Sequence, residues 1–391
     1  MGPHREDLRR QAGPVMHFIS AGAAHGLVKA VADEAGVEVA GSFGAVGAML
    51  DKFKSGEECD VVILTNAQIA ELTANGGVIA ETSADLGSVP TAIAVREASE
   101  LPDVSSEATL RAALLAADAI YFPDPARATA GIHFAKVLDQ LGIRAEVQAR
   151  IRNHPNGATA MAAMARDGGA PIGCTQATEI LATPGVRLVQ PLPKGFDLET
   201  VYTAAVATRS SRAKSAAEFV ARLSGESGRA ARIKAGFRGY VIRAASSRDG
   251  AAVRGVVESV LAEYGLSLDP AGIDADLGDL DASYPARGGL FDVAIASDGT
   301  VAGCCGLYPI DAKTGELRKM YVLKDARGSG LGGRLLRRSL AFARARGLER
   351  VELETASVLK EAIALYAGAG FRPVARAHLA PRCDQAFAID L

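Results

Sequence analysis

The sequence predicts an α/β protein of at least two domains. With 391 residues, of which 49% are hydrophobic and 23% charged, the chain is globular and too long for one ordinary core. Strand-like and helix-like segments alternate through the first half, and the pattern changes after a small polar stretch near residue 245. We therefore expect a two-lobed domain at residues 15–243, a linker at 244–249 and a second α/β domain at 250–391.

The first half has the rhythm of βα units on a parallel sheet. This rhythm restarts after Ser88, which predicts two lobes. A late apolar run, Val201–Thr208, is placed to return the chain to the first lobe, where a helix at 213–223 would pack. The other expected strands are 15–20, 37–43, 60–65, 91–95, 119–123, 172–175 and 186–191, and the helices are 24–35, one from Val46, 130–141 and 157–166.

Five segments of this half carry a family resemblance. They are Phe18-Ile-Ser-Ala-Gly-Ala-Ala-His-Gly26, Ser42-Phe-Gly-Ala-Val-Gly-Ala48, Asp60-Val-Val-Ile-Leu-Thr-Asn66, Asp124-Pro125 with Ala130-Gly131, and Val201-Tyr202. Together they resemble the type II periplasmic solute-binding proteins, most closely the molybdate-binding branch. The resemblance implies a hinged clamp of two lobes around a small ligand, usually an anion held by helix N-termini.

The polar residues that hold the oxyanion in molybdate binders are replaced here by Ala23, Val46 and Gln176. Each lost hydrogen bond to a charged group costs roughly 1.5–3 kcal/mol, so molybdate is not expected. A small polar or carboxylated organic ligand suits the remaining side chains better, although each of them also fits an ordinary role as a helix cap or surface residue. The candidates are Arg127, Thr129, Asn153, His154, Asn156, Thr175 and Gln176.

The second half begins with a helix-like segment, Val253–Tyr264, and an acidic stretch, Asp269–Asp281. An Asp-Gly turn at 298–299 marks a hairpin. The remaining expected strands are 290–296, 300–308, 316–323, 351–355, 371–376 and 385–391, and the remaining helices are one that ends near Arg346 and one at 359–367.

A glycine-rich loop, Arg327-Gly328-Ser329-Gly330-Leu331-Gly332, lies between the strand 316–323 and the following helix. Its glycines allow the chain to curl with several N–H groups pointing at one spot, and the helix N-terminus adds positive potential there. The loop is therefore a candidate seat for a pyrophosphate group.

Three motifs in a fixed order make residues 250–391 similar to the GNAT acetyltransferase superfamily. They are Glu316-Leu-Arg-Lys-Met-Tyr-Val322, Arg327-x-x-Gly330-x-Gly332 and Ala362-x-x-Leu365-Tyr366-x-x-x-Gly370-Phe371. A glycine loop alone is weak evidence, whereas the ordered set is strong. The resemblance implies direct attack of an amine on the thioester of acetyl-CoA, the expected cofactor.

The resemblance also implies roles for particular residues. The backbone of Tyr321, Val322 and Leu323 would hold the pantetheine arm, and Tyr366 would protonate the leaving thiolate. Glu316 is the first candidate for the general base, with Glu354 as runner-up. Each glutamate also fits an ordinary strand-edge charge, and Tyr366 also fits an ordinary core aromatic. The expected cofactor-binding residues are Tyr321, Val322, Leu323, Arg327, Gly328, Ser329, Gly330, Leu331 and Gly332. Leu359 replaces an asparagine that commonly contacts CoA in the family.

Composition excludes several other functions. A net charge of −2 without long basic runs argues against nucleic acid and anionic membranes as partners. The five cysteines lack the spacing of a metal site, so no metal is expected. The polar segment Met1–Gly13 and the short apolar run after it do not match a signal peptide, which predicts a cytoplasmic protein.

The first functional hypothesis is an N-acetyltransferase that acts on a primary amine and is regulated or supplied by the N-terminal clamp. Four acids of the acidic stretch, Asp274, Asp276, Asp279 and Asp281, hint at a cationic acceptor, but a solvated acidic helix is the favoured explanation for them. The alternative is a small-molecule or CoA sensor whose acetyltransferase-like domain is catalytically silent. A third hypothesis makes the clamp a degenerate structural remnant.

Overall fold

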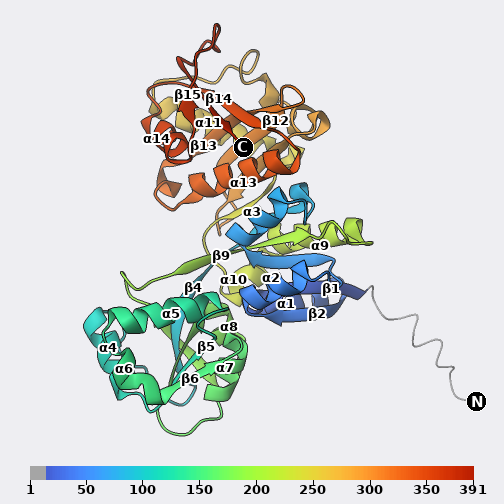
Figure 1. Ribbon diagram of the computed structural model, residues 1–391. Helices are drawn as coiled ribbons and strands as arrows, with labels where there is room; N and C mark the ends of the chain where they lie inside the picture. The colour runs from blue at the N-terminus through green and yellow to red at the C-terminus, as the bar shows by residue number, and fades with distance from the viewer. Residues whose placement is uncertain (1–14) are drawn as a thin grey trace, which may run out of the picture. The chain divides into compact units, whose positions relative to one another are not determined.

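The computed structural model describes residues 15–391, and the chain divides into two compact units, each described separately below (Figure 1). The first unit holds the chain through Gln68 and Leu86–Gly239, and the second holds Ile69–Asp85 and Tyr240–Leu391. Both units mix helices with a β-sheet, so the expected α/β class is confirmed. The polar segment Met1–Gly13 lies outside the described residues.

The first unit is built on a nine-stranded sheet in the order β2-β1-β3-β9-β4-β7-β5-β6, with β8 paired to β4. Pairs β1–β2, β1–β3, β5–β6 and β5–β7 are parallel, whereas β9 returns antiparallel to β3. The strands are β1 (Val15–Ala21), β2 (Glu38–Gly44), β3 (Val61–Thr65), β4 (Ala84–Arg96), β5 (Ile120–Pro123), β6 (Ile151–His154), β7 (Ile172–Gln176), β8 (Val186–Pro191) and β9 (Glu199–Val206).

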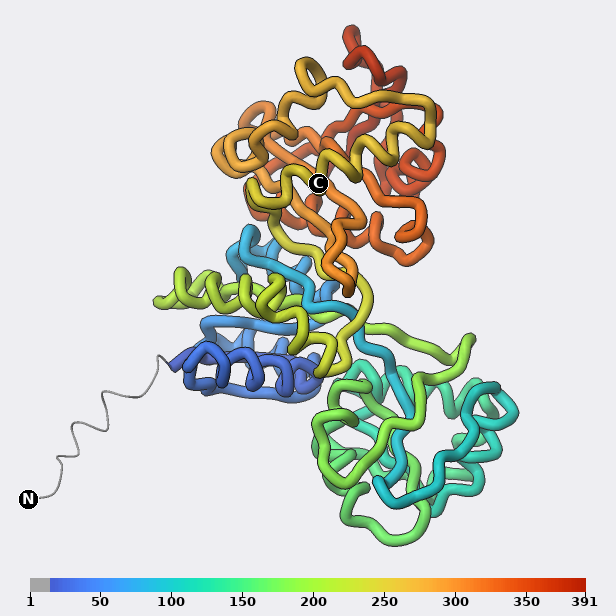
Figure 2. Tube along the Cα trace, turned by 180° about the vertical axis from the view of Figure 1, so that it is seen from behind, coloured from blue at the N-terminus to red at the C-terminus, as the bar shows by residue number. Residues whose placement is uncertain are grey.

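Helices pack on this sheet in two lobes, one around β1, β2 and β3 and one around β5, β6 and β7 (Figures 1 and 2). Their apolar faces follow the helical period; in α1, for example, Leu27, Val28 and Val31 are buried. The helices are α1 (His25–Ala35), α2 (Val46–Lys54), α4 (Glu107–Ala116), α5 (Thr129–Gln140), α6 (Arg144–Val147), α7 (Gly157–Met164), α8 (Ala177–Leu181), α9 (Ala213–Ser224) and α10 (Arg229–Ala235).

The second unit is built on a seven-stranded sheet in the order β10-β11-β12-β13-β14-β16-β15. Every neighbouring pair is antiparallel except β13–β14. The strands are β10 (Val241–Ala244), β11 (Leu290–Ile295), β12 (Val301–Pro309), β13 (Thr314–Val322), β14 (Arg350–Thr355), β15 (Arg372–Pro373) and β16 (Gln385–Asp390). The helices are α11 (Gly250–Glu263), α12 (Leu280–Ser283), α13 (Leu331–Ala345) and α14 (Lys360–Gly368).

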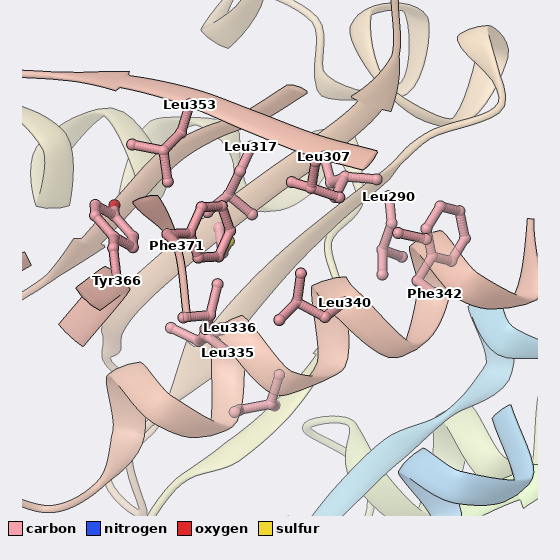
Figure 3. Packing of buried hydrophobic residues seen from close by; sticks show 14 of the residues in the cluster. Leu290, Leu307, Leu317, Leu335, Leu336, Leu340, Phe342, Leu353, Tyr366 and Phe371 are labelled. Atoms are coloured by element: carbon pink, nitrogen blue, oxygen red, sulfur yellow. The ribbon is translucent and has the colours of Figure 1, made fainter. Parts of the chain in front are cut away.

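Each face of this sheet has its own hydrophobic core. On one face, α11 packs with Val253, Val257 and Leu261 against Phe291 and Cys304 of the sheet. On the other face, α13 and α14 cover a cluster of leucines, with Tyr366 and Phe371 at one end of the cluster (Figure 3). The sheet thus holds α11 and α13 on opposite sides of β13, the strand that lines the candidate site.

The compact units divide the chain at other residues than the expected domains. Val241 and Ile242 pair with β11, so the strand β10 belongs to the sheet of the second unit. The expected linker 244–249 is also ordered, because Ser246 and Asp249 form a reciprocal capping box and Arg243 pairs with Asp249 at 2.8 Å. Residues 69–85, which include most of α3 (Asn66–Ala74), also belong to the second unit.

Candidate functional site

Strands β13 and β14 separate along their length. Their parallel pairing covers only Thr314–Glu316 and Arg350–Glu352. Beyond this point β14 pairs with β16, and β13 keeps only β12 as a partner. Within residues 15–391, the edge of β13 from Leu317 to Val322 that faces β14 therefore has no strand partner. Backbone groups of this edge are available to a ligand, except the Val322 carbonyl, which accepts from Arg327.

A pocket of about 460 Å³ lies beside the open end of β13. The glycine-rich loop and the N-terminus of α13 form one wall, and α11 and α14 form the opposite walls. Of the residues expected to bind the cofactor, Tyr321, Val322, Arg327, Gly328, Gly330, Leu331 and Gly332 line this pocket. The other lining residues are Val260, Tyr264, Met320, Ala326, Gly333, Leu359, Glu361, Ala362 and Leu365.

The glycine-rich loop has the geometry that phosphate binding needs. Gly328 and Gly330 have φ angles of 77° and 78°, which favour glycine over residues with a side chain. Gly330 is the N-cap of α13 and supplies no side chain to cap the first N–H groups of this helix. A Cβ atom at either position would meet nothing within 4 Å. The free N–H groups of the first turn thus adjoin open space where an anion fits.

Three of the expected cofactor residues have other partners. The Arg327 guanidinium binds Glu263 on α11 at 2.8 and 3.0 Å and donates through Nε to the carbonyl of Val322 at 3.0 Å. Its side chain therefore fixes the loop to α11 rather than pointing free into the pocket. Ser329 and Leu323 are not among the lining residues: the Ser329 hydroxyl donates to the Ala326 carbonyl, and the Leu323 N–H donates to the Ala302 carbonyl.

A second, smaller pocket of about 80 Å³ adjoins the first. Four residues line both pockets: Met320, Tyr321, Leu359 and Ala362. The smaller pocket also contains both expected catalytic residues, Glu316 and Tyr366, together with Glu354. The structure therefore brings the expected acid and base into one space that meets the larger pocket at the separation of β13 and β14.

Tyr366 is buried and held by packing. Its ring lies 5.8 Å from that of Phe371, and both belong to the core beneath the sheet (Figure 3). Burial raises the pKa of Tyr366, so its hydroxyl keeps its proton at neutral pH. Within residues 15–391, no hydrogen bond joins this hydroxyl to another residue. The Tyr366 side chain is thus a core aromatic that also lines the smaller pocket with a protonated hydroxyl.

The two glutamates differ in how many partners they have. Glu354 accepts a hydrogen bond from Arg376 at 2.6 Å and another from the Ala380 N–H at 2.9 Å. Glu316 accepts one, from the Tyr308 hydroxyl at 3.0 Å. Because a general base needs a free lone pair, Glu316 is better suited to that role than Glu354.

The four acids of the acidic stretch do not line the smaller pocket, although Ile273 of the same stretch does. Asp274 binds Arg382 at 2.7 and 2.8 Å and Lys319 at 2.9 Å. Asp276 accepts from the Tyr284 hydroxyl and pairs with Lys319, Asp279 caps α12, and Asp281 accepts from Ser247. Each of these four acids thus has a partner inside the protein, and recognition of a cationic acceptor by them stays a prediction that these contacts do not support.

The first unit has a cleft between its lobes with a volume of about 20 Å³. Of the residues expected to bind a ligand, Thr129, Asn156 and Gln176 line this cleft. Its other lining residues are Ala21, Gly22, Ala23, Gly44, Ala45, Val46, Pro123, Ala128, Ala130, Gly157, Glu179 and Tyr202. Ala23 and Val46, which the resemblance matched to polar positions of molybdate binders, are among these lining residues.

The other ligand candidates are not among the lining residues. Arg127 pairs with Asp51, and its carbonyl accepts the Gly47 N–H at 3.1 Å. Asn153 donates to the Phe122 carbonyl at 3.4 Å, and the His154 ring stacks on Tyr121. Thr175 is fully buried and donates to Glu179 at 2.6 Å. These interactions explain why the four side chains do not project into the cleft.

Sequence reasoning missed two residues of the cleft, Glu179 and Tyr202, as site residues. Glu179 lies three residues after Gln176, and nothing in the local sequence separates it from a surface glutamate of a short helix. In the second unit the reasoning missed Tyr264 and Glu361, which form a 2.8 Å hydrogen bond across the larger pocket. They lie about 100 residues apart, so only the fold reveals the contact.

Two families match the chain. The family of bacterial extracellular solute-binding proteins matches residues 18–238, and the acetyltransferase (GNAT) family matches residues 259–371. Within residues 15–391, no helix has both the length and the apolar composition needed to cross a membrane.

Individual proteins are similar to parts of the chain. An uncharacterized N-acetyltransferase of Escherichia coli, YjgM, is 37% identical over 139 residues, which are 34% of this chain and 83% of the relative. An aconitate isomerase of a Pseudomonas species is 26% identical over 170 residues, which are 43% of this chain and 63% of the isomerase. The periplasmic molybdate-binding protein of Azotobacter vinelandii is 18% identical with a TM-score of 0.47, over 57% of this chain and 98% of that one.

The long solute-binding match and the close N-acetyltransferase relative cover different parts of the chain. The pockets described above lie in the corresponding units. The chain therefore belongs to both families, as a bacterial extracellular solute-binding protein domain joined to an acyltransferase of the GNAT family.

Proposed function

We propose that this chain transfers an acetyl group from acetyl-CoA to a primary amine. The observation that carries the proposal is the junction of the two pockets at the open edge of β13, with Tyr366 and Glu316 beside it. A cofactor in the larger pocket would present its thioester to an amine in the smaller one.

The residues of the larger pocket fit acetyl-CoA. Uncapped N–H groups at the start of α13 would hold the pyrophosphate, and the unpaired backbone of β13 would bind the pantetheine arm as an added strand binds. When bound, acetyl-CoA supplies an activated acetyl group as a thioester. A backbone N–H of β13 would hydrogen-bond the thioester carbonyl and favour attack.

The side chains of the smaller pocket would move the protons. Glu316 would accept the proton that leaves the attacking amine, directly or through a water molecule. Tyr366 would give its proton to the thiolate as it leaves. Glu316 accepts only one hydrogen bond, which leaves lone pairs for the incoming proton, and the raised pKa of Tyr366 keeps its hydroxyl protonated.

The test is release of free thiol from acetyl-CoA by the full chain, measured with a panel of primary amines. We expect Tyr366→Phe to lower kcat by about 10²-fold while acetyl-CoA binding is kept, because only the transferred proton is lost. Tyr240→Phe is the matched control, since Tyr240 packs against the same core but does not line either pocket.

Two outcomes would contradict the proposal. A chain that neither binds acetyl-CoA nor releases thiol is not an acetyltransferase of this kind. A chain that binds acetyl-CoA but releases no thiol with any amine, and that Tyr366→Phe leaves unchanged, is the CoA sensor of the alternative hypothesis.

We further propose that the cleft of the first unit binds a small polar or carboxylated molecule. The relative named aconitate isomerase supports a carboxylated ligand, because aconitate is a tricarboxylate. Regulation of acetyl transfer by this ligand rests on the presence of both units in one chain. Adding candidate ligands to the thiol-release assay tests this regulation.

We also propose that the protein is cytoplasmic, which cell fractionation would test.

A further inference from the structure

Glu179 is a buried carboxylate without a cation. Its residue is 7% exposed, and within residues 15–391 it forms no salt bridge with a lysine, arginine or histidine. Its hydrogen-bond donors are the Thr175 hydroxyl at 2.6 Å and the backbone N–H groups of Ala158, Gln176 and Gly157. Buried carboxylates in proteins usually have a cationic partner. Glu179 is unusual because it is buried without one among residues 15–391.

The carboxylate lies at the cleft, between glycines of both lobes. A Cβ atom at Gly157 would lie 2.0 Å from Oε2 of Glu179, and one at Gly22 would lie 2.8 Å from Oε1. Both glycines line the cleft with Glu179. Because these glycines have no side chains, they leave the space that the carboxylate needs. An anionic ligand placed there would be repelled by the negative charge of Glu179.

Gln176 gives a second, independent sign of a missing donor. Its side chain is 3% exposed and lines the cleft, and its Nε2 donates to Thr200 at 3.2 Å. Its Oε1 is buried without a hydrogen-bond partner. A buried acceptor left unpaired in this way is destabilising, and a hydrogen-bond donor from a ligand would remove that penalty.

Other parts of the cleft favour negative charge. The N-termini of α2 and α5 both line it, and their N-cap residues, Ala45 and Ala128, provide no side-chain cap. Helices of nine and twelve residues thus present the positive end of their dipoles to the cleft, and in α2 the Gly47 N–H of the first turn donates to the Arg127 carbonyl at 3.1 Å. By contrast, Asn156 caps α7 with its side chain.

We propose that the cleft binds a small amino acid, whose ammonium group pairs with Glu179 and donates to Gln176 and whose carboxylate lies at the N-termini of α2 and α5. The inference rests on the proposed ligand-binding function of the first unit and names its ligand class. A volume of about 20 Å³ admits roughly one water molecule. The lobes therefore open to admit the ligand, which breaks the Gly47–Arg127 hydrogen bond between them.

The test is calorimetry on the full chain with three probes of similar size: alanine, ethylamine and propionate. They carry both charges, the positive charge alone and the negative charge alone. The other standard amino acids extend the panel if alanine is too small or too large. We expect an amino acid to bind at least tenfold more tightly than ethylamine, and propionate to bind most weakly.

Variants assign the binding to the cleft rather than to the amine pocket of the second unit. Glu179→Gln should weaken amino-acid binding at least tenfold, and Gln176→Leu should weaken it several-fold. Glu218→Gln is the control, because Glu218 is an exposed carboxylate of α9 outside the cleft. If Glu179→Gln does not fold, as thermal unfolding would show, Gln176→Leu decides the question.

Three results would overturn the inference. They are tighter binding of propionate or aconitate than of every amino acid, no binding of any amino acid, and unchanged binding in both cleft variants. Acetyl-CoA titration of the same sample separates this failure from failure of the proposed acetyl transfer. Normal acetyl-CoA binding without amino-acid binding rejects only the ligand class proposed for the cleft.

Discussion

Two buried carboxylates, Asp274 in the second unit and Glu179 in the first, are stabilised in opposite ways. Asp274 has two cationic partners, Lys319 and Arg382. Glu179 has only hydroxyl and N–H donors. The charge of Asp274 is therefore balanced by cations of the protein itself, whereas the environment of Glu179 is that of a carboxylate that still lacks a cation. A completed ion cluster suits a structural role, and an incomplete one suits a ligand site.

Their pKa values differ in the same way. Burial alone would raise the pKa of Asp274, but hydrogen bonds from Arg382, the Asp269 backbone and Lys319 hold it well below its usual range. For Glu179, burial is the larger effect and raises the pKa despite its hydrogen bonds. The contributions of the two carboxylates to the free energy of unfolding therefore change in opposite directions as pH rises.

The largest expected effect comes from removing the charge of Asp274. Asp274→Asn leaves Arg382 without its anion and Lys319 with Asp276 alone, and we expect a loss of about 3–5 kcal/mol in the free energy of unfolding of the second unit. Urea titration monitored for each transition measures it. Asp325→Asn, at an exposed carboxylate of the same unit, should change stability by less than about 0.5 kcal/mol.

An equal loss of stability in Asp274→Asn and Asp325→Asn would show that the ion pairs of Asp274 do not stabilise the second unit. The same measurement on Glu179→Gln sharpens the comparison, since no cation loses its partner there. We expect that variant to lose only about 1 kcal/mol, the value of a typical hydrogen bond.

The pH dependence of stability should show the opposite signs directly. The folded pKa of Asp274 is lowered, so its contribution is present above its ordinary value of 3.8 and is lost as pH falls toward the folded value. The folded pKa of Glu179 is raised, so its contribution is present below its ordinary value of 4.5 and is lost as pH rises through the folded value. Asp274→Asn should flatten the acid loss, and Glu179→Gln should flatten the loss at higher pH.

Unfolding followed from pH 3 to pH 8 in both variants measures these slopes. If the two substitutions changed the pH dependence of the free energy of unfolding in the same direction, the predicted difference between Asp274 and Glu179 would be wrong. Glu218→Gln again serves as the reference, because an exposed carboxylate should leave both slopes unchanged.

A smaller effect should show whether the glycine-rich loop of the second unit acts in cofactor binding or only in stability. Gly330→Val places a branched side chain at a φ of 78° and in front of the N–H groups of α13. We expect acetyl-CoA affinity to fall at least tenfold, as calorimetry would measure. Gly347→Val is a matched control, because Gly347 has a φ of 74°, follows the same helix and also has open space around its Cβ position.

Both glycine variants carry the same strain, about 1–2 kcal/mol for a left-handed residue with a side chain. They should therefore lose similar stability. If Gly347→Val lost acetyl-CoA binding as strongly as Gly330→Val, the loop would act through stability and not through contact with the cofactor.

The sequence by itself determined the α/β class, both families and the position of the glycine-rich loop. These features depend on local patterns: alternating apolar runs give the strands, and glycine supplies the positive φ that the loop needs. The ordered motifs also placed Glu316 and Tyr366 near one another, and the structure puts both in the smaller pocket.

Only the tertiary structure decided which polar residues have partners inside the protein. Asp274 resembled a surface acid in the sequence but is buried between Lys319 and Arg382. Glu179 resembled a surface glutamate but lies in the cleft against the N-terminus of α7. The reason is physical: a charge is stabilised by groups that surround it in space, and those groups come from segments far apart in the chain.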